Sequence, residues 1–331
     1  MDFETLASEA QAIRERINRF RTSLSQYFVG KKDIVDLMTL CAVAQEPLLL
    51  VGPPGTAKSA LVLKFKDALD IDDQRYFEYM LTRFTEPSEV MGPIDIARLR
   101  GGEYIRRVQG KLPTAELVFL DEIFKSNSAI LNSLLTVINE KKFYQDGRAV
   151  PVSLRILFAA TNDIPEQAEL AALKDRFCLK VACRSVQQDH FMELVDSGLE
   201  DATNRDLGRR PWSEGHADLG DFYKAHRYLS LQMSKRDVDP DGKVVRDRHL
   251  FFPDELLVEL RRLVKTLVLE DDVFVSDRKV VKLYRLLRTR AWLHRGGRVE
   301  RVDLVLLSYL GETQAEMDLL EEKVPKLLGI Q

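Results

Sequence analysis

The sequence predicts an α/β core, with a parallel sheet between two layers of helices, followed by a smaller all-α domain. Short unbroken apolar runs of strand length recur through the first half of the chain and alternate with helical patterns. Strands that alternate with helices favour a parallel sheet that is covered on both faces. After a polar segment that contains glycine and proline, the pattern is helical almost to residue 331. The order of these patterns therefore separates an α/β part from an all-α part.

The first helices and the first strand can be placed from the spacing of apolar residues and from the positions of proline and glycine. Apolar residues recur at helical spacing over residues 3–24 and again over residues 31–44. Pro47 ends the second pattern, and the run 48–51 is apolar throughout and followed at once by glycine and proline, which is typical of a strand buried on both faces. A helix is expected to begin near Lys58.

Later runs extend the same alternation and set the expected domain boundaries. Apolar runs over 117–120, 156–160 and 177–182 predict further strands, and 128–139 predicts a helix. From 184 to 252 the chain is polar and irregular, with Gly208, Pro211, Gly215, Pro240 and Gly242. We expect an N-terminal helix at 1–26, an α/β nucleotide-binding core at 27–184, a linker with an irregular insertion at 185–252, and an all-α lid at 253–331.

Composition limits the possible partners and compartments. The chain is 45% hydrophobic and 31% charged, and its net charge is -3. This charge gives no global reason to bind nucleic acid or an anionic membrane. The acidic N-terminus lacks the pattern of a secretory signal, and no apolar run approaches the length of a membrane span. The three cysteines form neither a CxxC pair nor an even disulfide set. We expect a cytoplasmic protein without membrane insertion.

A phosphate-binding loop is the strongest signal for function. The residues Gly52, Pro53, Pro54, Gly55, Thr56, Ala57, Lys58 and Ser59 stand between the buried strand and the next helix. Successive backbone N–H groups of such a loop wrap polyphosphate, while the lysine reaches the β and γ phosphates and the hydroxyl binds magnesium. We assign nucleotide binding to these residues and Ala60. Ala57 replaces the usual last glycine, which is harmless if its φ is negative.

Two later strands deliver polar residues to the edge of the sheet where ligands of open α/β folds bind. The strand at 117–120 is followed by Asp121, which can hold magnesium, and Glu122, which can polarise the attacking water. Acidic residues can also end a strand merely because they are soluble. Because the same chain contains a phosphate-binding loop, we favour a catalytic role for this pair. The strand at 156–160 ends near Asn162, whose amide could orient water or touch the γ phosphate. An Asn-Asp pair is also an ordinary turn.

The order and the residues of these motifs resemble those of AAA+ ATPases of the MoxR family, in particular its RavA-like branch. The resemblance runs through nearly the whole chain, over YFVG (27–30), GPPGTAKS (52–59), LTRFT (81–85), LVFLDEIFK (117–125), ATND (160–163), LKDRF (173–177) and VSDR (275–278).

The resemblance implies roles for individual residues. Val29 and Gly30 would line the adenine pocket, and Asn162 would be the first sensor. Arg176 would be the finger supplied to a neighbour's nucleotide, where an arginine neutralises charge on the transferring phosphoryl group. Arg278, in the helical domain, would be the second sensor. An arginine beside an aspartate could equally be a surface ion-pair partner, which spacing does not exclude.

Two segments resemble the remodelling parts of this family. Residues 143–150 contain an Asp-Gly turn between strand-like flanks, which predicts a hairpin. Residues 94–108 contain Gly101 and Gly102 between possible strands. Five basic residues lie in or beside this insert: Arg98, Arg100, Arg106, Arg107 and Lys111. A solvated face is the simpler interpretation, and contact with an acidic partner or nucleic acid is the alternative.

The combined prediction is a chaperone-like ATPase that uses ATP and Mg²⁺ in a homo-oligomeric, hexameric ring to remodel, mature or load an unidentified client protein. The resemblance implies a separate partner with a von Willebrand factor A (vWA) domain, because this sequence has no DxSxS motif of its own. Three rivals remain: a nucleotide-gated scaffold, a DNA-engaged motor and a P-loop small-molecule kinase. The kinase leaves Arg176 and the helical domain unexplained.

Overall fold

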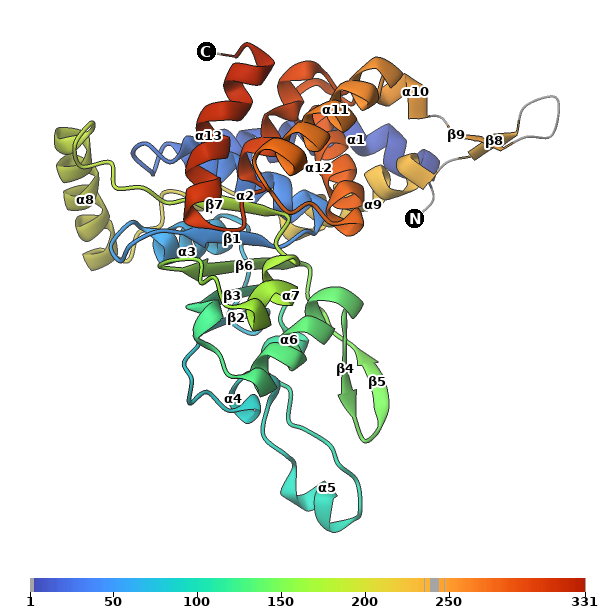
Figure 1. The fold of residues 1–331 in the computed structure, drawn as a ribbon. Helices are drawn as coiled ribbons and strands as arrows, with labels where there is room; N and C mark the ends of the chain where they lie inside the picture. Colours follow the sequence, from blue (N-terminus) through green and yellow to red (C-terminus); the bar gives the residue numbers. More distant parts are fainter. Residues whose placement is uncertain (1–2, 235, 239–243, 247, 331) are drawn as a thin grey trace.

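A five-stranded sheet forms the centre of the computed structural model, which describes residues 3–234, 236–238, 244–246 and 248–330. Its strand order is β2-β3-β6-β1-β7, and every neighbouring pair is parallel (Figure 1). The strands are β1 (Leu48–Val51), β2 (Tyr76–Met80), β3 (Leu117–Asp121), β6 (Ile156–Thr161) and β7 (Leu179–Ala182). The predicted parallel sheet is confirmed.

The central strands are apolar throughout because both faces of the sheet are covered. Side chains of a strand alternate between the two faces. Accordingly, Leu48 and Leu50 belong to one buried cluster, whereas Leu49 and Val51 belong to a second cluster on the other face. Phe65 and Phe158 meet edge to face in the first cluster, with ring centroids 5.2 Å apart. Two separate cores thus fix the sheet from both sides.

Each face has its own set of helices. The first cluster draws on α1 (Phe3–Ser25), α2 (Lys32–Ala44), α3 (Lys58–Ala68) and α9 (Leu219–Ser234). The second draws on α4 (Pro87–Met91), α6 (Ser128–Glu140), α7 (Ala171–Lys174) and the 3₁₀ turns η1 (Leu112–Thr114), η2 (Ile123–Lys125) and η3 (Ala168–Leu170). This is the layered arrangement that the sequence predicts.

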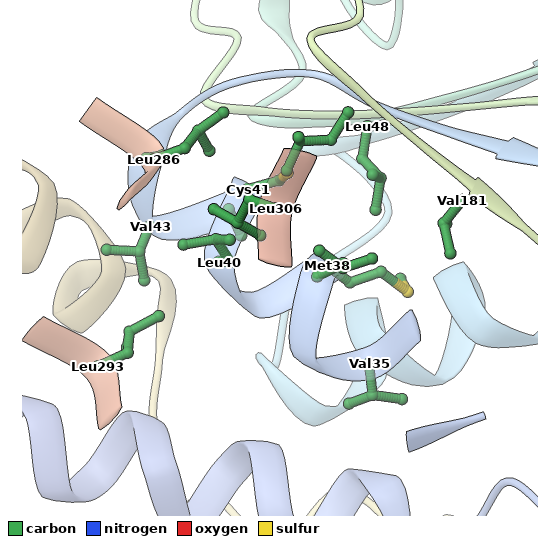
Figure 2. Packing of buried hydrophobic residues seen from close by; sticks show 14 of the residues in the cluster. Val35, Met38, Leu40, Cys41, Val43, Leu48, Val181, Leu286, Leu293 and Leu306 are labelled. Atoms are coloured by element: carbon green, nitrogen blue, oxygen red, sulfur yellow. The ribbon is translucent and has the colours of Figure 1, made fainter. Parts of the chain in front are cut away.

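The C-terminal part is all-helical, as expected for a lid. It consists of α10 (Arg248–Phe251), α11 (Asp254–Glu270), α12 (Asp277–Arg295), the 3₁₀ helix η4 (Arg301–Tyr309) and α13 (Gln314–Leu328). Leucines of the lid, such as Leu286 and Leu306, pack with Met38 of α2 and Leu48 of β1 (Figure 2). The lid therefore shares its core with one face of the sheet.

The expectation of an irregular segment at 185–252 is wrong for much of that range. It contains two 16-residue helices, α8 (Phe191–Asp206) and α9, and a small hairpin of β8 (Arg236–Val238) and β9 (Val244–Arg246). Arg16 of α1 pairs with Asp221 of α9 at 2.5 Å, and Phe20 meets Phe222 edge to face. Tertiary packing thus stabilises α9, which the surrounding glycines and prolines obscure in the sequence. Pro240 and Gly242 lie outside the described residues.

The predicted hairpin exists, but the insert before it differs from expectation. β4 (Lys142–Gln145) and β5 (Arg148–Pro151) pair antiparallel around Asp146 and Gly147, whose φ values of 50° and 70° suit a tight hairpin turn. Residues 94–108 form a short helix, α5 (Ile96–Arg100), and one isolated bridge instead of two strands. Asp95 caps α5 by accepting hydrogen bonds from the backbone N–H groups of Ala97 and Arg98.

The insert is basic but partly neutralised by its own residues. Arg98 pairs with Glu103 at 3.1 Å, and Arg107 pairs with Asp95 at 3.2 Å. Arg106 donates a hydrogen bond to the backbone oxygen of Gly92. These contacts favour a solvated face. In Figure 1, α5 projects from the body of the molecule, on the side away from the lid.

The cysteines are buried and unpaired. Cys41, Cys178 and Cys183 are free thiols, and burial raises the pKa of Cys178 and Cys183 to about 11. Among the described residues no group of three or more His, Cys, Asp and Glu side chains could hold a metal ion. The helices that the structure describes include none with both the length and the apolar character to cross a membrane.

Candidate nucleotide site

The phosphate-binding loop leads from the end of β1 directly into α3. Gly52 lies so close to the end of β7 that a Cβ on it would be 2.4 Å from the backbone oxygen of Cys183, which excludes any side chain there. Gly55 has a φ of 82°, and nothing lies within 4 Å of a Cβ built on it. The loop is thus held closely at its start and is open at Gly55, where a polyphosphate can approach the backbone.

Ala57 corrects one expectation. Its φ is +66°, in the left-handed region, so the condition under which the replacement of glycine would be harmless is not met. An L-residue in this region costs about 1–2 kcal/mol because its Cβ crowds the backbone. The loop keeps this positive φ in spite of the cost. The hydroxyl of Thr56 stabilises the loop by donating a hydrogen bond to the backbone oxygen of Pro53 at 2.8 Å.

Lys58 turns inward at the start of α3. Its Nζ donates hydrogen bonds to the backbone oxygens of Gly52 and Pro53 and, at 3.2 Å, to Oδ1 of Asn162. The side chain is buried, so these acceptors replace the water that an ammonium group would otherwise require. Lys58 is therefore held against the loop whose phosphate ligand it would bind, whereas Pro53, Pro54, Ser59 and Ala60 are exposed.

Glu122 and Asn162 meet at the end of β3 and β6. Nδ2 of Asn162 donates to Oε1 of Glu122 at 2.5 Å, and Lys125 pairs with the same carboxylate oxygen at 3.0 Å. Glu122 is buried and has a φ of 53°, while the carboxylate of Asp121 accepts a hydrogen bond from the backbone N–H of Glu122. The structure thus brings Lys58, Asn162 and Glu122 into one hydrogen-bonded chain.

A pocket of about 160 Å³ adjoins the loop. Val29, Thr56, Ala57 and Ala60 line it together with residues of α8. Gly30 lines the neighbouring pocket instead, and its φ of 63° and close approach to Val186 favour glycine at that turn. Residues 27–29 therefore lie where an adenine could reach them beside the loop.

The two arginines lie at the other edge of the sheet. Arg176 comes just before β7, and Arg278 lies in the first turn of α12; each is near the carboxylate of Asp175, at 3.1 Å and 3.6 Å. In a parallel sheet the N-terminal and C-terminal ends of the strands form opposite edges. The structure therefore does not bring Arg176 or Arg278 to the phosphate-binding loop of the same chain.

The lid holds this arginine pair in place. The hydroxyl of Ser276 donates to Asp175 at 2.7 Å, and Lys282 of α12 donates to the backbone oxygen of Arg176 at 2.9 Å. The side chain of Arg176 is largely buried, and within the described chain its Nε has no hydrogen-bond partner.

Some residues of the site were not found by sequence reasoning. Lys125, three residues after Glu122, could have been noticed from its spacing, and Asp175 from its position beside Arg176. By contrast, Lys31 and Arg184 line the pocket next to the loop without any motif. Nζ of Lys31 donates to the backbone oxygen of Arg184, and burial lowers the pKa of Lys31.

The parallel sheet, the phosphate-binding loop, the acidic pair and the helical lid together define a P-loop ATPase of the AAA+ class. Residues 15–213 match the family described as the MoxR domain in the MoxR-vWA-beta-propeller ternary systems, and residues 254–323 match an AAA lid domain. The chain therefore belongs to the MoxR family of AAA+ ATPases.

The chain is also similar to other proteins in sequence or in fold. Two uncharacterized proteins of Methanocaldococcus jannaschii are 28% and 29% identical to it, over 90% and 89% of this chain and 70% of each relative. A crystal structure of a candidate ATPase from Cytophaga hutchinsonii matches with a TM-score of 0.70 over 99% of this chain and 97% of that one. Its sequence identity is 15%, so this likeness shows the fold alone.

Proposed function

We propose that this chain hydrolyses ATP with Mg²⁺ at the junction between neighbouring copies of a hexameric ring. One observation carries the proposal: Lys58, Asn162 and Glu122 converge at the C-terminal edge of the sheet, whereas Arg176 and Arg278 lie at the opposite edge. A head-to-tail arrangement of copies places opposite faces against each other and closes into a ring. Each site would then receive its arginines from the next copy.

The residues of one copy have separate tasks in this proposal. When nucleotide binds, Lys58 gives up its hydrogen bonds to the loop carbonyls and contacts the β and γ phosphates. The backbone N–H groups of residues 55–60 bind the same anion. Asn162 holds the carboxylate of Glu122, which orients and polarises the attacking water. Ser59 and Asp121 would hold Mg²⁺, whose charge offsets that of the phosphates when it is bound. Val29 flanks the base, and Gly30 forms the turn beside it.

The neighbouring copy supplies positive charge. Arg176 is the proposed finger and Arg278 the proposed second sensor, and both would act on the neighbour's phosphates. Asp175 holds the two guanidinium groups close together until that surface meets the neighbour. Positive charge near the transferring phosphoryl group stabilises the transition state, with an effect of about 10³ to 10⁵ on rate in related chemistry.

The ATPase cycle is proposed to remodel or mature a client protein together with a partner that carries a vWA domain. The matched family model supports this partner, because its description places the MoxR domain in systems that also contain vWA and beta-propeller components. The residues of the motifs favour the RavA-like branch within the family. We place the protein in the cytoplasm because its three thiols are free and buried, as suits a reducing compartment.

Mixing two inactive variants tests the shared site. Arg176→Ala and Glu122→Gln should each lower ATP turnover about 10³-fold when they are alone. In mixed rings, a site with an intact Glu122 from one variant and an intact Arg176 from the other is complete, so turnover should recover. Turnover is measured as phosphate release at a fixed total concentration of protein.

The matched control mixes Glu122→Gln with Lys58→Ala. Both changes damage the same edge of the sheet, so every site in these mixed rings stays defective and no recovery is expected. If the Arg176→Ala mixture also stays inactive although mixed rings are detected, the trans arrangement is wrong.

A further inference from the structure

Helix α8 presents an apolar stripe to solvent. None of its residues is buried, and Phe191, Met192 and Leu199 are 55%, 67% and 65% exposed. Spacings of three and four residues place these side chains and Val195 on one face of the helix. These four residues are called the apolar stripe. Figure 1 shows α8 standing apart from the other helices at one side of the molecule. A contiguous exposed apolar surface of this kind marks an interaction site.

The position of α8 connects the apolar stripe to the nucleotide site. Asp201 of α8 forms an ion pair with Lys64 of α3 at 2.7 Å, and Leu194, Ser197 and Gly198 line the pocket beside the phosphate-binding loop. The helix thus stands at the C-terminal edge of the sheet with one side toward the pocket. The stripe lies on another side and is left uncovered.

The remaining surface of α8 is acidic. The helix carries Glu193, Asp196, Glu200, Asp201 and Asp206 against one basic residue, Arg205. Of the acidic residues, Asp201 is paired with Lys64 and Glu193 contacts His190, both within the same chain. A partner that covers the apolar stripe therefore needs an apolar contact flanked by positive charge.

A groove at the opposite edge of the sheet has these properties. It has a volume of about 430 Å³ and lies next to Pro47, which precedes β1. Val281 is 63% exposed in this groove. We call it the basic groove because four cationic side chains line it: Lys141, Arg278, Lys282 and Arg285.

The carboxylates near the basic groove do not neutralise all of its positive charge. Glu46 accepts ion pairs from both Lys282 and Arg285, at 2.8 Å and 3.6 Å, and Arg278 is near Asp175. Within the described residues, no carboxylate forms an ion pair with Lys141. The groove therefore carries more cations than its carboxylates neutralise.

We propose that the apolar stripe of α8 docks into the basic groove of a second copy of this chain. The two surfaces are complementary in apolar character and in charge, and they lie at opposite edges of one sheet, so the contact is head-to-tail and repeats around a ring. Arg278 is part of the groove, so docking carries it toward the nucleotide pocket that α8 adjoins. This contact rests on the proposed ring and names the surfaces that form it.

Matched substitutions test the contact. Leu199→Lys in the stripe and Val281→Glu in the groove should each raise the apparent dissociation constant for assembly about 10- to 100-fold, because each loses a buried aliphatic side chain and places a charge against like charge. Leu269→Lys and Leu269→Glu are the controls, because Leu269 of α11 is a similarly exposed leucine outside both surfaces. Assembly is measured by sedimentation velocity with a slowly hydrolysed ATP analogue, and binding of a fluorescent nucleotide to dilute protein reports folding.

Cross-linking provides a second measurement that does not depend on disrupting the fold. With a flexible bismaleimide, the pair Leu199→Cys and Val281→Cys should give a ladder of linked copies, whereas Leu199→Cys with Leu269→Cys should not. The native cysteines are buried and give little background.

The outcomes separate the docking contact from the ring itself. If the parent assembles, Leu199→Lys and Val281→Glu assemble like the Leu269 controls, and the cysteine pair gives no ladder, the docking contact is wrong while the ring stands. If the parent stays monomeric at all concentrations and is fully active, the ring fails and the docking contact fails with it.

Discussion

The two edges of the central sheet differ in how complete they are within one chain. At the C-terminal edge, Lys58, Asn162 and Glu122 satisfy one another through hydrogen bonds. At the N-terminal edge, Arg176, Arg278 and Lys141 leave positive charge without full compensation. The hydrogen bonds at the C-terminal edge form within one chain, whereas the surplus charge at the N-terminal edge indicates a surface that awaits a ligand or a second copy.

At the self-satisfied edge, Asn162→Ala should have a large effect on turnover, although a smaller one than Glu122→Gln. Removing the amide leaves the carboxylate of Glu122 with Lys125 alone and removes an acceptor from Lys58. We expect the maximal turnover to fall about 10²-fold, the scale for losing one positioned polar group in an active site. Nucleotide affinity, measured by fluorescence titration, should change much less because the loop is intact.

Asp163→Asn is a suitable control for this change. Asp163 is the next residue and is exposed, and its backbone oxygen, which the substitution keeps, accepts the hydrogen bond from Thr161. Equal losses in Asn162→Ala and Asp163→Asn would show that the turn, and not the amide of Asn162, matters for turnover.

A smaller effect is expected from Lys141→Met at the other edge. Burial lowers the pKa of Lys141 from 10.5 to about 8. Between about pH 8 and 10.5 the unfolded chain therefore binds more protons than the folded chain, so the stability contributed by this group rises with pH. Lys141→Met should increase the free energy of unfolding at pH 7, by about 1–3 kcal/mol, and flatten the rise above pH 8.

Urea denaturation of nucleotide-free protein at several pH values checks this prediction. Part of the rise should remain in the variant, because burial also lowers the pKa of Lys180 to about 8. A pH profile that Lys141→Met leaves unchanged would mean that solvent, and not a desolvated site, surrounds this lysine in solution.

The smallest expected effect is that of Ala57→Gly in the phosphate-binding loop. Glycine adopts the observed φ of +66° without steric cost but loses more backbone entropy on folding. The net gain in the free energy of unfolding should be about 0.5–1 kcal/mol. Thermal denaturation of both forms checks it, and a decrease in stability would mean that the loop relaxes to a negative φ in solution.

How far the sequence predicts this structure depends on how local each feature is. The loop at 52–59 and the acidic pair after β3 are contiguous, so their place follows from the adjoining strands. The position of Asn162 against Glu122 also follows, because β3 and β6 are neighbours in the sheet. The alternation of apolar runs and helical patterns was likewise enough to predict the α/β core and the helical lid.

Features that depend on distant contacts were not predictable in this way. Helix α9 was missed because its stability comes from packing against α1, and α8 was missed because its exposed apolar residues lie among acidic ones. The positive φ of Ala57 depends on the path of the whole loop. The basic groove is formed by residues in or next to α2, α6 and α12. These residues are far apart in the sequence, and no single motif contains them.

The carboxylate of Asp175 links the lid to the segment that carries Arg176. It receives Ser276 and Arg278 from the lid side and Arg176 from the core side, while Lys282 holds the backbone of Arg176. The start of α12 and the segment that carries the proposed finger are therefore joined by three polar contacts, those of Ser276, Arg278 and Lys282. A displacement of α12 either breaks these contacts or moves Arg176 with it, so the position of the lid is coupled to the position of the finger.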